Sequence, residues 1–179
     1  MTGPNGAQRK RKVMIATLTK SGDVTAYYAL ALAASSRLAG ERGLDLYPKF
    51  FVDMSFVHHA RNLAMGSMLA EGCDDVIFAD ADNDWGPDWP FALLAHPVDV
   101  VGGTYARKQE AEYYELRSIA NPVRRCATTN LIIVDGLGAG FLRLSRKAVQ
   151  ALWDNSPAYK FRGDPTRLMC DLPIVNGNA

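Results

Sequence analysis

Cysteine and histidine are scarce in this sequence. Its 179 residues include three cysteines, Cys73, Cys126 and Cys170, and three histidines. The cysteines are odd in number and far apart, which supports neither a disulfide framework nor a zinc site. His58 and His59 are adjacent on a predicted helix and would point about 100° apart, so they cannot easily share a metal ion. We therefore expect structural roles for both of these histidines.

Long apolar runs and an excess of charge are missing as well. No apolar segment reaches the roughly 18 residues of a membrane-spanning helix. No apolar core follows the N-terminal basic residues, as a secretory signal would require. The formal net charge is only +1, so no generally basic surface for nucleic acid is expected. These absences predict a cytoplasmic protein that neither crosses a membrane nor binds nucleic acid.

What is present suits one α/β domain. Residues 1–12 lack apolar periodicity and end in the basic run Arg9-Lys10-Arg11-Lys12, so they are predicted to be a disordered basic tail. Residues 13–179 are expected to form a single domain, since the chain is 48% hydrophobic and too short for two domains of ordinary size.

Strand-like and helix-like patterns alternate along the first half of this domain, which predicts a mostly parallel sheet. Asp23 is the predicted N-cap of the first helix, and residues 53–55 are expected to cap the second. Residues 106–129 are charged and aperiodic, which suggests a mobile lid over an anionic substrate. Residues from 155 onward are expected to be loop-like. The predicted strands are 13–18, 44–52, 76–79 and 99–105, with a hairpin-like pair at 131–134 and 141–144, and the predicted helices are 24–39, 56–70, 90–95 and 145–153.

The stretch from Val76 to Trp85 is the centre of the functional prediction. Its apolar first part is typical of a strand buried on both faces, and Asp80 and Asp82 follow directly. In an extended chain, residues i and i+2 project to the same side, so these two carboxylates would lie together. Such a pair is unfavourable unless a cation lies between them, and hard divalent ions prefer carboxylate oxygen. The stretch predicts a metal and diphosphate site; the alternative is an acidic strand end that solvates a loop and caps the next helix.

Arg61 lies on the predicted helix that precedes this acidic strand. In a parallel sheet, the N-terminal end of a helix lies at the same edge as the carboxyl end of a strand. Arg61 could therefore hold a nucleotide or pair with one of the acids. The paired glycines Gly102 and Gly103 indicate a close approach of a ligand or of another backbone, or a bulge.

Four pieces of the sequence, in this order, resemble the GT-A glycosyltransferases, especially small bacterial and phage-type members. They are the threonine-rich turn ATLTKSG after the first strand, Ala60-Arg61-Asn62, the Asp-x-Asp motif in FADAD, and GGTYARK followed by GAGFLRLSRKAV. The similarity spans roughly residues 13–152. It implies a GT-A-like, Rossmann-like three-layer sandwich that uses a nucleoside-diphosphate sugar.

The resemblance also implies roles for individual residues. In that family the Asp-x-Asp motif binds Mn²⁺ or Mg²⁺ that bridges the donor diphosphate. By match, Asp82 would be the direct metal ligand, and Asp80 would contact the metal shell, the ribose or the donor sugar. The other implied contacts are Thr17 and Thr19 with the nucleotide, Arg61 with the donor, and the segments around Gly103 and Gly140 with the donor sugar and acceptor.

The chain departs from the family pattern near its end. Family members commonly carry a late acidic Gly-Glu-Asp-type segment and often a late histidine, whereas the last histidine here is His96. Asp164 and Asp171 are the carboxylates available in that region, and either could act as the catalytic base. The other interpretation is a shortened domain that binds the donor but transfers poorly. Retention or inversion at the anomeric carbon stays open.

The sequence thus predicts a metal-dependent glycosyltransferase that moves a sugar from a nucleoside-diphosphate donor to a sugar, protein or lipid acceptor. One alternative is a noncatalytic GT-A-like nucleotide-binding domain. A sugar nucleotidyltransferase is another, since it too binds a nucleotide phosphate and a divalent metal. A short C-terminal part would leave an apolar edge that a partner or a homodimer covers.

Overall fold

The computed structural model describes residues 9–54, 56–104, 116–117 and 120–170. The elements along the chain are β1 (Lys12–Leu18), α1 (Ala26–Glu41), β2 (Asp45–Phe51), α2 (Val57–Ala70), β3 (Asp75–Ala79), α3 (Trp89–Ala95), β4 (Val100–Gly102), β5 (Leu116–Arg117), β6 (Gly136–Leu137), β7 (Phe141–Ser145), α4 (Arg146–Asn155), β8 (Ala158–Phe161) and β9 (Asp164–Arg167).

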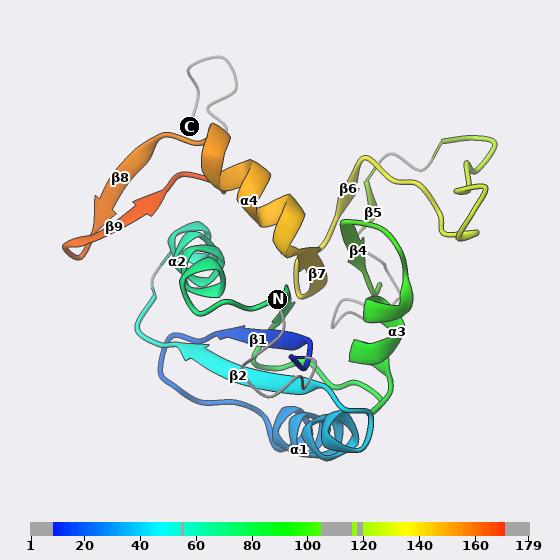
Figure 1. The fold of residues 1–179 in the computed structure, drawn as a ribbon, viewed down its shortest axis with the longest axis horizontal. Helices are drawn as coiled ribbons and strands as arrows, with labels where there is room; N and C mark the ends of the chain where they lie inside the picture. Colours follow the sequence, from blue (N-terminus) through cyan, green and yellow to red (C-terminus); the bar gives the residue numbers. More distant parts are fainter. Residues whose placement is uncertain (1–8, 55, 105–115, 118–119, 171–179) are drawn as a thin grey trace, which may run out of the picture.

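The central sheet has five strands in the order β2-β1-β3-β7-β4. β1 is parallel to both β2 and β3, whereas β7 is antiparallel to both of its neighbours, β3 and β4. The predicted α/β fold with a mostly parallel central sheet is therefore confirmed (Figure 1). Two small antiparallel pairs, β5-β6 and β8-β9, lie outside this sheet.

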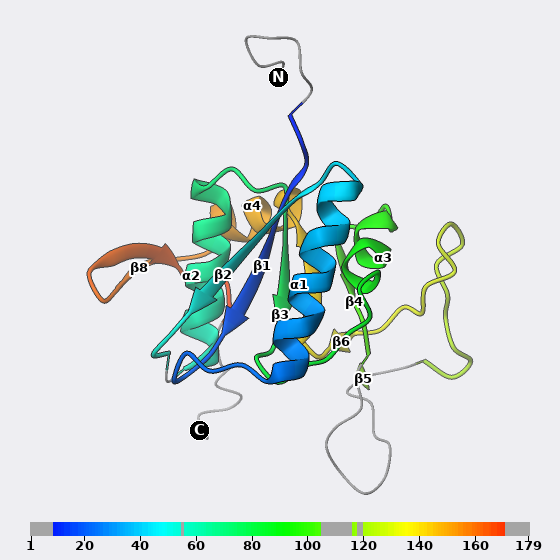
Figure 2. The same ribbon diagram turned by 90° about the horizontal axis from the view of Figure 1, so that it is seen from below.

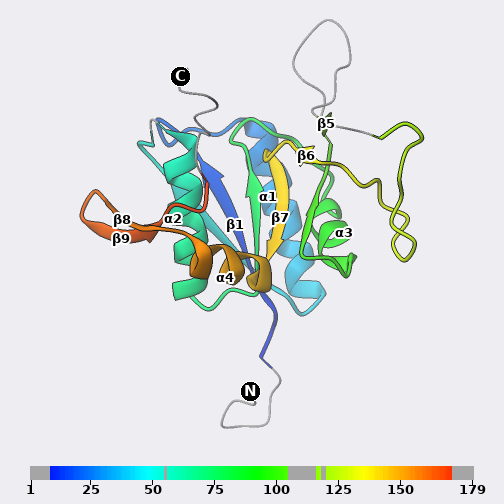
Figure 3. The ribbon, with the colours of Figure 1, turned by 90° about the horizontal axis from the view of Figure 1, so that it is seen from above.

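Helices cover both faces of the sheet. On one face, α1 and α3 pack on side chains such as Val13 and Ile77 (Figure 2). On the other face, α2 and α4 pack on the alternate residues of the same strands, including Met14 and Val76 (Figure 3). Every residue of β3 is buried, as expected for a central strand covered on both sides.

The helix starts agree with the sequence in one case and differ in two. Ser145 caps α4 as predicted, because its side chain accepts a hydrogen bond from the Ala148 amide. α1 begins later than predicted, and its N-cap is Thr25, whose side chain accepts from the Tyr28 amide, so the prediction of Asp23 is wrong. α2 begins after Phe56 without a side-chain cap.

The predicted hairpin between residues 131–134 and 141–144 is wrong. β7 instead pairs with β3 and β4, while Ile132 forms an isolated antiparallel bridge with Arg125. A buried ion pair explains the placement of β7, because Arg143 on β7 donates from Nε to a carboxylate oxygen of Asp75 on β3 at 2.7 Å. Both side chains are almost fully buried, so each needs the other.

The basic tail is shorter than predicted. Lys12 already belongs to β1, and Arg11 donates from Nε to Asp75 at 2.7 Å. The disorder predicted for residues 1–12 is therefore wrong at its C-terminal end, because the buried carboxylate of Asp75 attracts a second guanidinium. The β8-β9 hairpin also corrects the prediction of a loop-like end. Within the described residues, no helix is both long and apolar enough to span a membrane.

Candidate functional site

The carboxyl ends of the neighbouring strands β1 and β3 form a switch point, because the connections that follow these two strands lead toward opposite edges of the sheet. β1 continues through α1 to β2 on one side, and β3 continues through α3 toward β4 on the other. Ligands of open α/β sheets bind at such a switch point, in the crevice beyond the strand ends. The two loops are tied together there, because the Thr25 amide at the start of α1 donates to the Ala81 carbonyl oxygen at 3.0 Å.

The acidic motif forms a turn at this switch point. β3 ends at Ala79, and the Asn83 amide donates to the Asp80 carbonyl oxygen at 3.0 Å, which closes the turn from Asp80 to Asn83. The prediction that Asp80 and Asp82 share one side of an extended strand is therefore wrong in its geometry. Asp82 is nevertheless close enough to Asp80 to raise the pKa of that carboxyl, so a turn and not a strand brings the two charges together.

The segment before β7 holds the acidic turn in place. The Gly140 carbonyl oxygen accepts from the Asp80 amide at 2.9 Å and from the Asn83 side-chain amide at 2.6 Å. On the next strand, the Gly103 amide donates to the Phe141 carbonyl oxygen at 2.9 Å. Of the predicted site residues, Gly140 thus contacts the turn through its backbone, whereas Gly103 contacts Phe141, the residue after Gly140.

Gly102 and Gly103 allow a close approach of other protein atoms. A Cβ on Gly102 would lie 2.3 Å from Leu137 Cδ2 and 3.0 Å from the Phe141 carbonyl oxygen. A Cβ on Gly103 would lie 3.1 Å from the Phe141 ring. Of the explanations left open by the sequence, close approach of the neighbouring chain segment accounts for this pair.

The electrostatics of the turn favour a bound cation. Burial raises the pKa of the Asp80 carboxyl above its usual range, the nearby Arg61 guanidinium opposes this rise, and Asp82 adds to it. Asp80 is thus held near a like charge in a partly desolvated place. A divalent ion would relieve both penalties, because it compensates the two carboxylates together.

Arg61 lies in the first half of α2, at the edge of the sheet where the sequence predicts it. Its charge acts on Asp80, yet it forms no ion pair within 4.0 Å with any described acid. Its Nε is buried and has no hydrogen-bond partner. A desolvated donor of this kind is costly, and an anionic ligand would satisfy it.

The two predicted threonines already have partners inside the protein. The hydroxyl of Thr17 is buried and shares a hydrogen bond with the Tyr28 hydroxyl, whose pKa is raised by burial. Thr19 accepts from the Gly22 amide at 3.1 Å and donates to the Asp23 carbonyl oxygen at 3.1 Å, so it shapes the loop before α1. Their contacts with a nucleotide stay predictions.

The predicted catalytic carboxylates are less well placed by the structure. Asp164 begins β9, whose hairpin with β8 packs beside α2 (Figure 1), and only its backbone is described. Asp171 lies outside the described residues, as do residues 106–115 and 118–119 of the predicted lid. The chain just before Asp171 is anchored on α2, because Asn62 accepts from the Cys170 amide at 2.7 Å and donates to its carbonyl oxygen at 3.1 Å.

The donor set at the turn fits a metal that shares its ligands with a substrate. Among the residues that the structure describes, no group of three or more His, Cys, Asp or Glu side chains could hold a metal ion. Mg²⁺ is usually held by one or two carboxylates, with water and substrate phosphates completing its coordination. Asp80 and Asp82 supply this kind of set, and the unpartnered Arg61 Nε is suited to the same phosphates.

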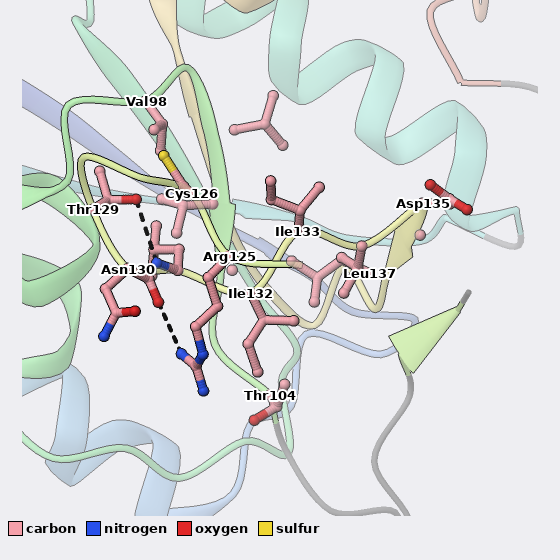
Figure 4. A pocket seen from close by; sticks show the side chains of 16 residues that line it. Val98, Thr104, Arg125, Cys126, Thr129, Asn130, Ile132, Ile133, Asp135 and Leu137 are labelled. Carbon is pink, nitrogen blue, oxygen red and sulfur yellow. Dashed lines mark hydrogen bonds between the residues drawn. The ribbon is translucent and has the colours of Figure 1, made fainter. Parts of the chain in front are cut away.

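Sequence reasoning missed a pocket along β4. It has a volume of about 720 Å³ and is lined by Val98, Val100, Val101, Gly102, Thr104, Arg125, Cys126, Thr129, Asn130, Leu131, Ile132, Ile133, Val134, Asp135, Gly136 and Leu137. Its outer wall is a small hairpin in which the Cys126 amide donates to the Leu131 carbonyl oxygen at 2.8 Å (Figure 4). The turn residues Thr128 to Asn130 before the apolar run 131–134 are the signal that could have indicated this hairpin.

Comparisons with known proteins add little to this geometry. No protein-family model matches the chain. No curated protein matches it. Among solved structures, a glycosyltransferase involved in the glycosylation of the major capsid of PBCV-1 is similar, with a TM-score of 0.40 and 11% sequence identity. The match covers 79% of this chain and 66% of that chain, so this protein spans less than two thirds of that protein's length. Overlap at this level identifies neither the fold family nor the activity of this chain.

Proposed function

We propose that this protein is a metal-dependent glycosyltransferase with a GT-A-like three-layer fold, and that its donor is a nucleoside-diphosphate sugar. The observation that carries the proposal is the acidic turn at the switch point, with the buried Nε of Arg61 near it that has no hydrogen-bond partner. The turn brings two carboxylates close together, and the Nε of Arg61 can donate to an anion. A metal diphosphate would provide a cation for the carboxylates and an anion for Arg61.

Asp82 and Asp80 would hold the metal, Mn²⁺ or Mg²⁺. When bound, the ion supplies charge stabilisation for a leaving nucleoside diphosphate. The protein's part is to fix the geometry: Gly140 and Asn83 anchor the turn, and the Thr25 amide bond to Ala81 fixes the turn against the start of α1. Arg61 would bind the donor phosphates from the α2 side.

The proposed reaction transfers the donor sugar to an acceptor hydroxyl. An acceptor oxygen forms a bond to the anomeric carbon, the bond from that carbon to the diphosphate breaks, and the acceptor proton passes to a carboxylate. Asp164 and Asp171 are the residues we propose for that proton. Asn62 binds the backbone of Cys170, which is the residue before Asp171. Burial raises the pKa of Cys170 and the Arg61 guanidinium opposes this rise, so Cys170 lies near Arg61.

A nucleotide-sugar hydrolysis screen tests the proposal. UDP- and GDP-sugars are incubated with the protein and Mn²⁺, and the release of nucleoside diphosphate is measured. In a parallel reaction, UTP or GTP is incubated with sugar 1-phosphates, and the release of pyrophosphate is measured. We expect release of the diphosphate without pyrophosphate, and a loss of at least about 100-fold in Asp82→Ala. Asp84→Ala is the matched control, because it removes the same charge from the same exposed loop.

Each alternative predicts a different result in this screen. Pyrophosphate release from a nucleoside triphosphate and a sugar 1-phosphate would identify a sugar nucleotidyltransferase. Metal-dependent nucleotide binding without turnover of any donor, with or without added acceptors, would identify a noncatalytic binding domain. Equal turnover in Asp82→Ala and the wild type would contradict the assigned metal site.

A further inference from the structure

The pocket along β4 has an unusual lining for a protein that handles sugars. Its described side chains include branched aliphatic residues from both walls and no aromatic residue. Val100, Ile132 and Ile133 remain 56%, 42% and 41% exposed, although they line it. Thr104, Thr129, Asn130 and Asp135 also line the pocket. An apolar chain bound there would remove the exposed aliphatic surface from water.

The pocket lies along β4. Its wall follows the chain from Val98, before β4, to Thr104, after it. β4 is antiparallel to β7 and β7 to β3, so β4 points the same way as β3 and ends at the same edge of the sheet. The Thr104 end of the pocket is therefore the end nearest the acidic turn.

Short backbone contacts connect this end to the turn. Leu137, in the pocket wall, closes on Gly102, and Gly103 bonds to Phe141 at 2.9 Å. The residue before Phe141, Gly140, accepts from the Asp80 amide at 2.9 Å. The pocket and the proposed donor site thus lie on opposite sides of β7, at the same edge of the sheet.

A cation lies on the rim of the pocket. Arg125 is exposed and donates from Nη1 to the Asn130 carbonyl oxygen at 2.9 Å, which orients its guanidinium at the wall (Figure 4). Among the described residues, no acid forms an ion pair with it. A guanidinium in this position suits a phosphate or carboxylate attached to an apolar chain.

We propose that this pocket binds the alkyl chain of an amphiphilic acceptor, with an anionic group of the acceptor at Arg125. This inference rests on the proposed glycosyltransferase function and narrows its acceptor to an alkyl-chain class. The pocket volume, about 720 Å³, lies within the range of small-molecule sites. The pocket lies at the same edge of the sheet as the acidic turn, which favours a substrate over a structural lipid as its occupant.

Calorimetric titration with alkyl phosphates tests the proposal without metal or nucleotide. Hexyl, octyl and decyl phosphate are used below their critical micelle concentrations, with inorganic phosphate and decanol as references. Affinity should rise about fourfold for each added methylene until the pocket is filled. Inorganic phosphate alone should not bind measurably. An affinity that does not depend on chain length would overturn the proposal.

Matched variants locate the binding. Ile132→Gln should weaken decyl phosphate at least tenfold, whereas Val123→Gln should leave it unchanged, because Val123 is 50% exposed in the same region but does not line the pocket. Arg125→Gln should weaken decyl phosphate but not decanol. Equal loss of affinity for decyl phosphate in Ile132→Gln and Val123→Gln would indicate binding to a general apolar surface and overturn the assignment. Equal adsorption of both variants to phosphatidylglycerol vesicles would do the same.

A second measurement uses the wild-type protein, so it does not depend on the folding of a variant. Cys126 lines the pocket, and bound decyl phosphate should slow its alkylation by iodoacetamide at least fivefold, whereas inorganic phosphate should not. Unchanged alkylation at saturating decyl phosphate would place the ligand elsewhere. If the protein binds decyl phosphate but binds no nucleotide in the presence of metal, the alkyl-binding pocket is supported and the proposed glycosyltransferase function is contradicted.

Discussion

Two threonine hydroxyls control the chemistry of Cys126. The Cys126 sulfur lies 3.2 Å from the Thr128 hydroxyl oxygen, and hydrogen bonds from Thr128 and then Thr129 lower the pKa of the thiol to about 6. The alkylation rate of Cys126 should therefore rise with pH around a midpoint near 6, because only the thiolate reacts. Mass-spectrometric mapping of iodoacetamide adducts measures this profile. Thr128→Val should move the midpoint upward; a wild-type midpoint near that of an ordinary thiol, about 8.5, would contradict the assignment.

Asp75 stabilises the central sheet through the ion pairs of its buried carboxylate. Its carboxylate is 1% exposed and binds Arg143 on β7 and Arg11 before β1. Asp75→Ala should lower the free energy of unfolding by about 3–5 kcal/mol, because it leaves the Arg143 guanidinium buried without its counter-ion. Urea unfolding measures the change.

Glu41→Ala is the control for this substitution. It removes the exposed Arg37–Glu41 ion pair within α1 and should cost no more than about 0.5 kcal/mol. Equal losses for Glu41→Ala and Asp75→Ala would show that burial of the Asp75 cluster does not matter.

At the scale of elements, two helical glycines should respond to the same substitution with opposite signs. A Cβ on Gly66 of α2 would lie 2.9 Å from the Trp153 ring of α4, whereas a Cβ on Gly40 of α1 meets nothing within 4 Å. Gly40→Ala should stabilise the protein by about 0.5 kcal/mol through helix propensity. Gly66→Ala should destabilise it by about 1 kcal/mol or more, because α4 must move away from α2. Thermal unfolding compares the two; stabilisation by Gly66→Ala would contradict the α2–α4 packing.

The elements also show what the sequence could and could not predict. Local signals located the strands and helices up to β4, because apolar runs and helical spacing are properties of short segments. They failed at β7, whose partner is set by the burial of Arg143 against Asp75, 68 positions away in sequence. They failed again at the acidic motif, where a turn closed by Asn83 replaces the extended geometry assumed for Asp80 and Asp82.

At the scale of the whole molecule, the switch point gathers residues that are distant in sequence. Asp80, Arg61 and Gly140 come from three separate segments, and the sequence placed them together only through the rule for parallel strand ends and through family resemblance. The β4 pocket could not be predicted in this way, because its walls depend on the path of the chain between β4 and β7. A homodimer covering an apolar edge stays a prediction.

The central claim is that the acidic turn binds a metal diphosphate. Isothermal titration of the protein with UDP and GDP, with and without Mn²⁺, tests it directly. We predict that one nucleotide binds only with the metal, and that Asp82→Ala weakens this binding at least tenfold while Asp84→Ala does not. Absence of binding for both nucleotides under every metal condition, or binding that is equal in Asp82→Ala, would contradict the account and leave the acidic turn a structural feature of the strand end.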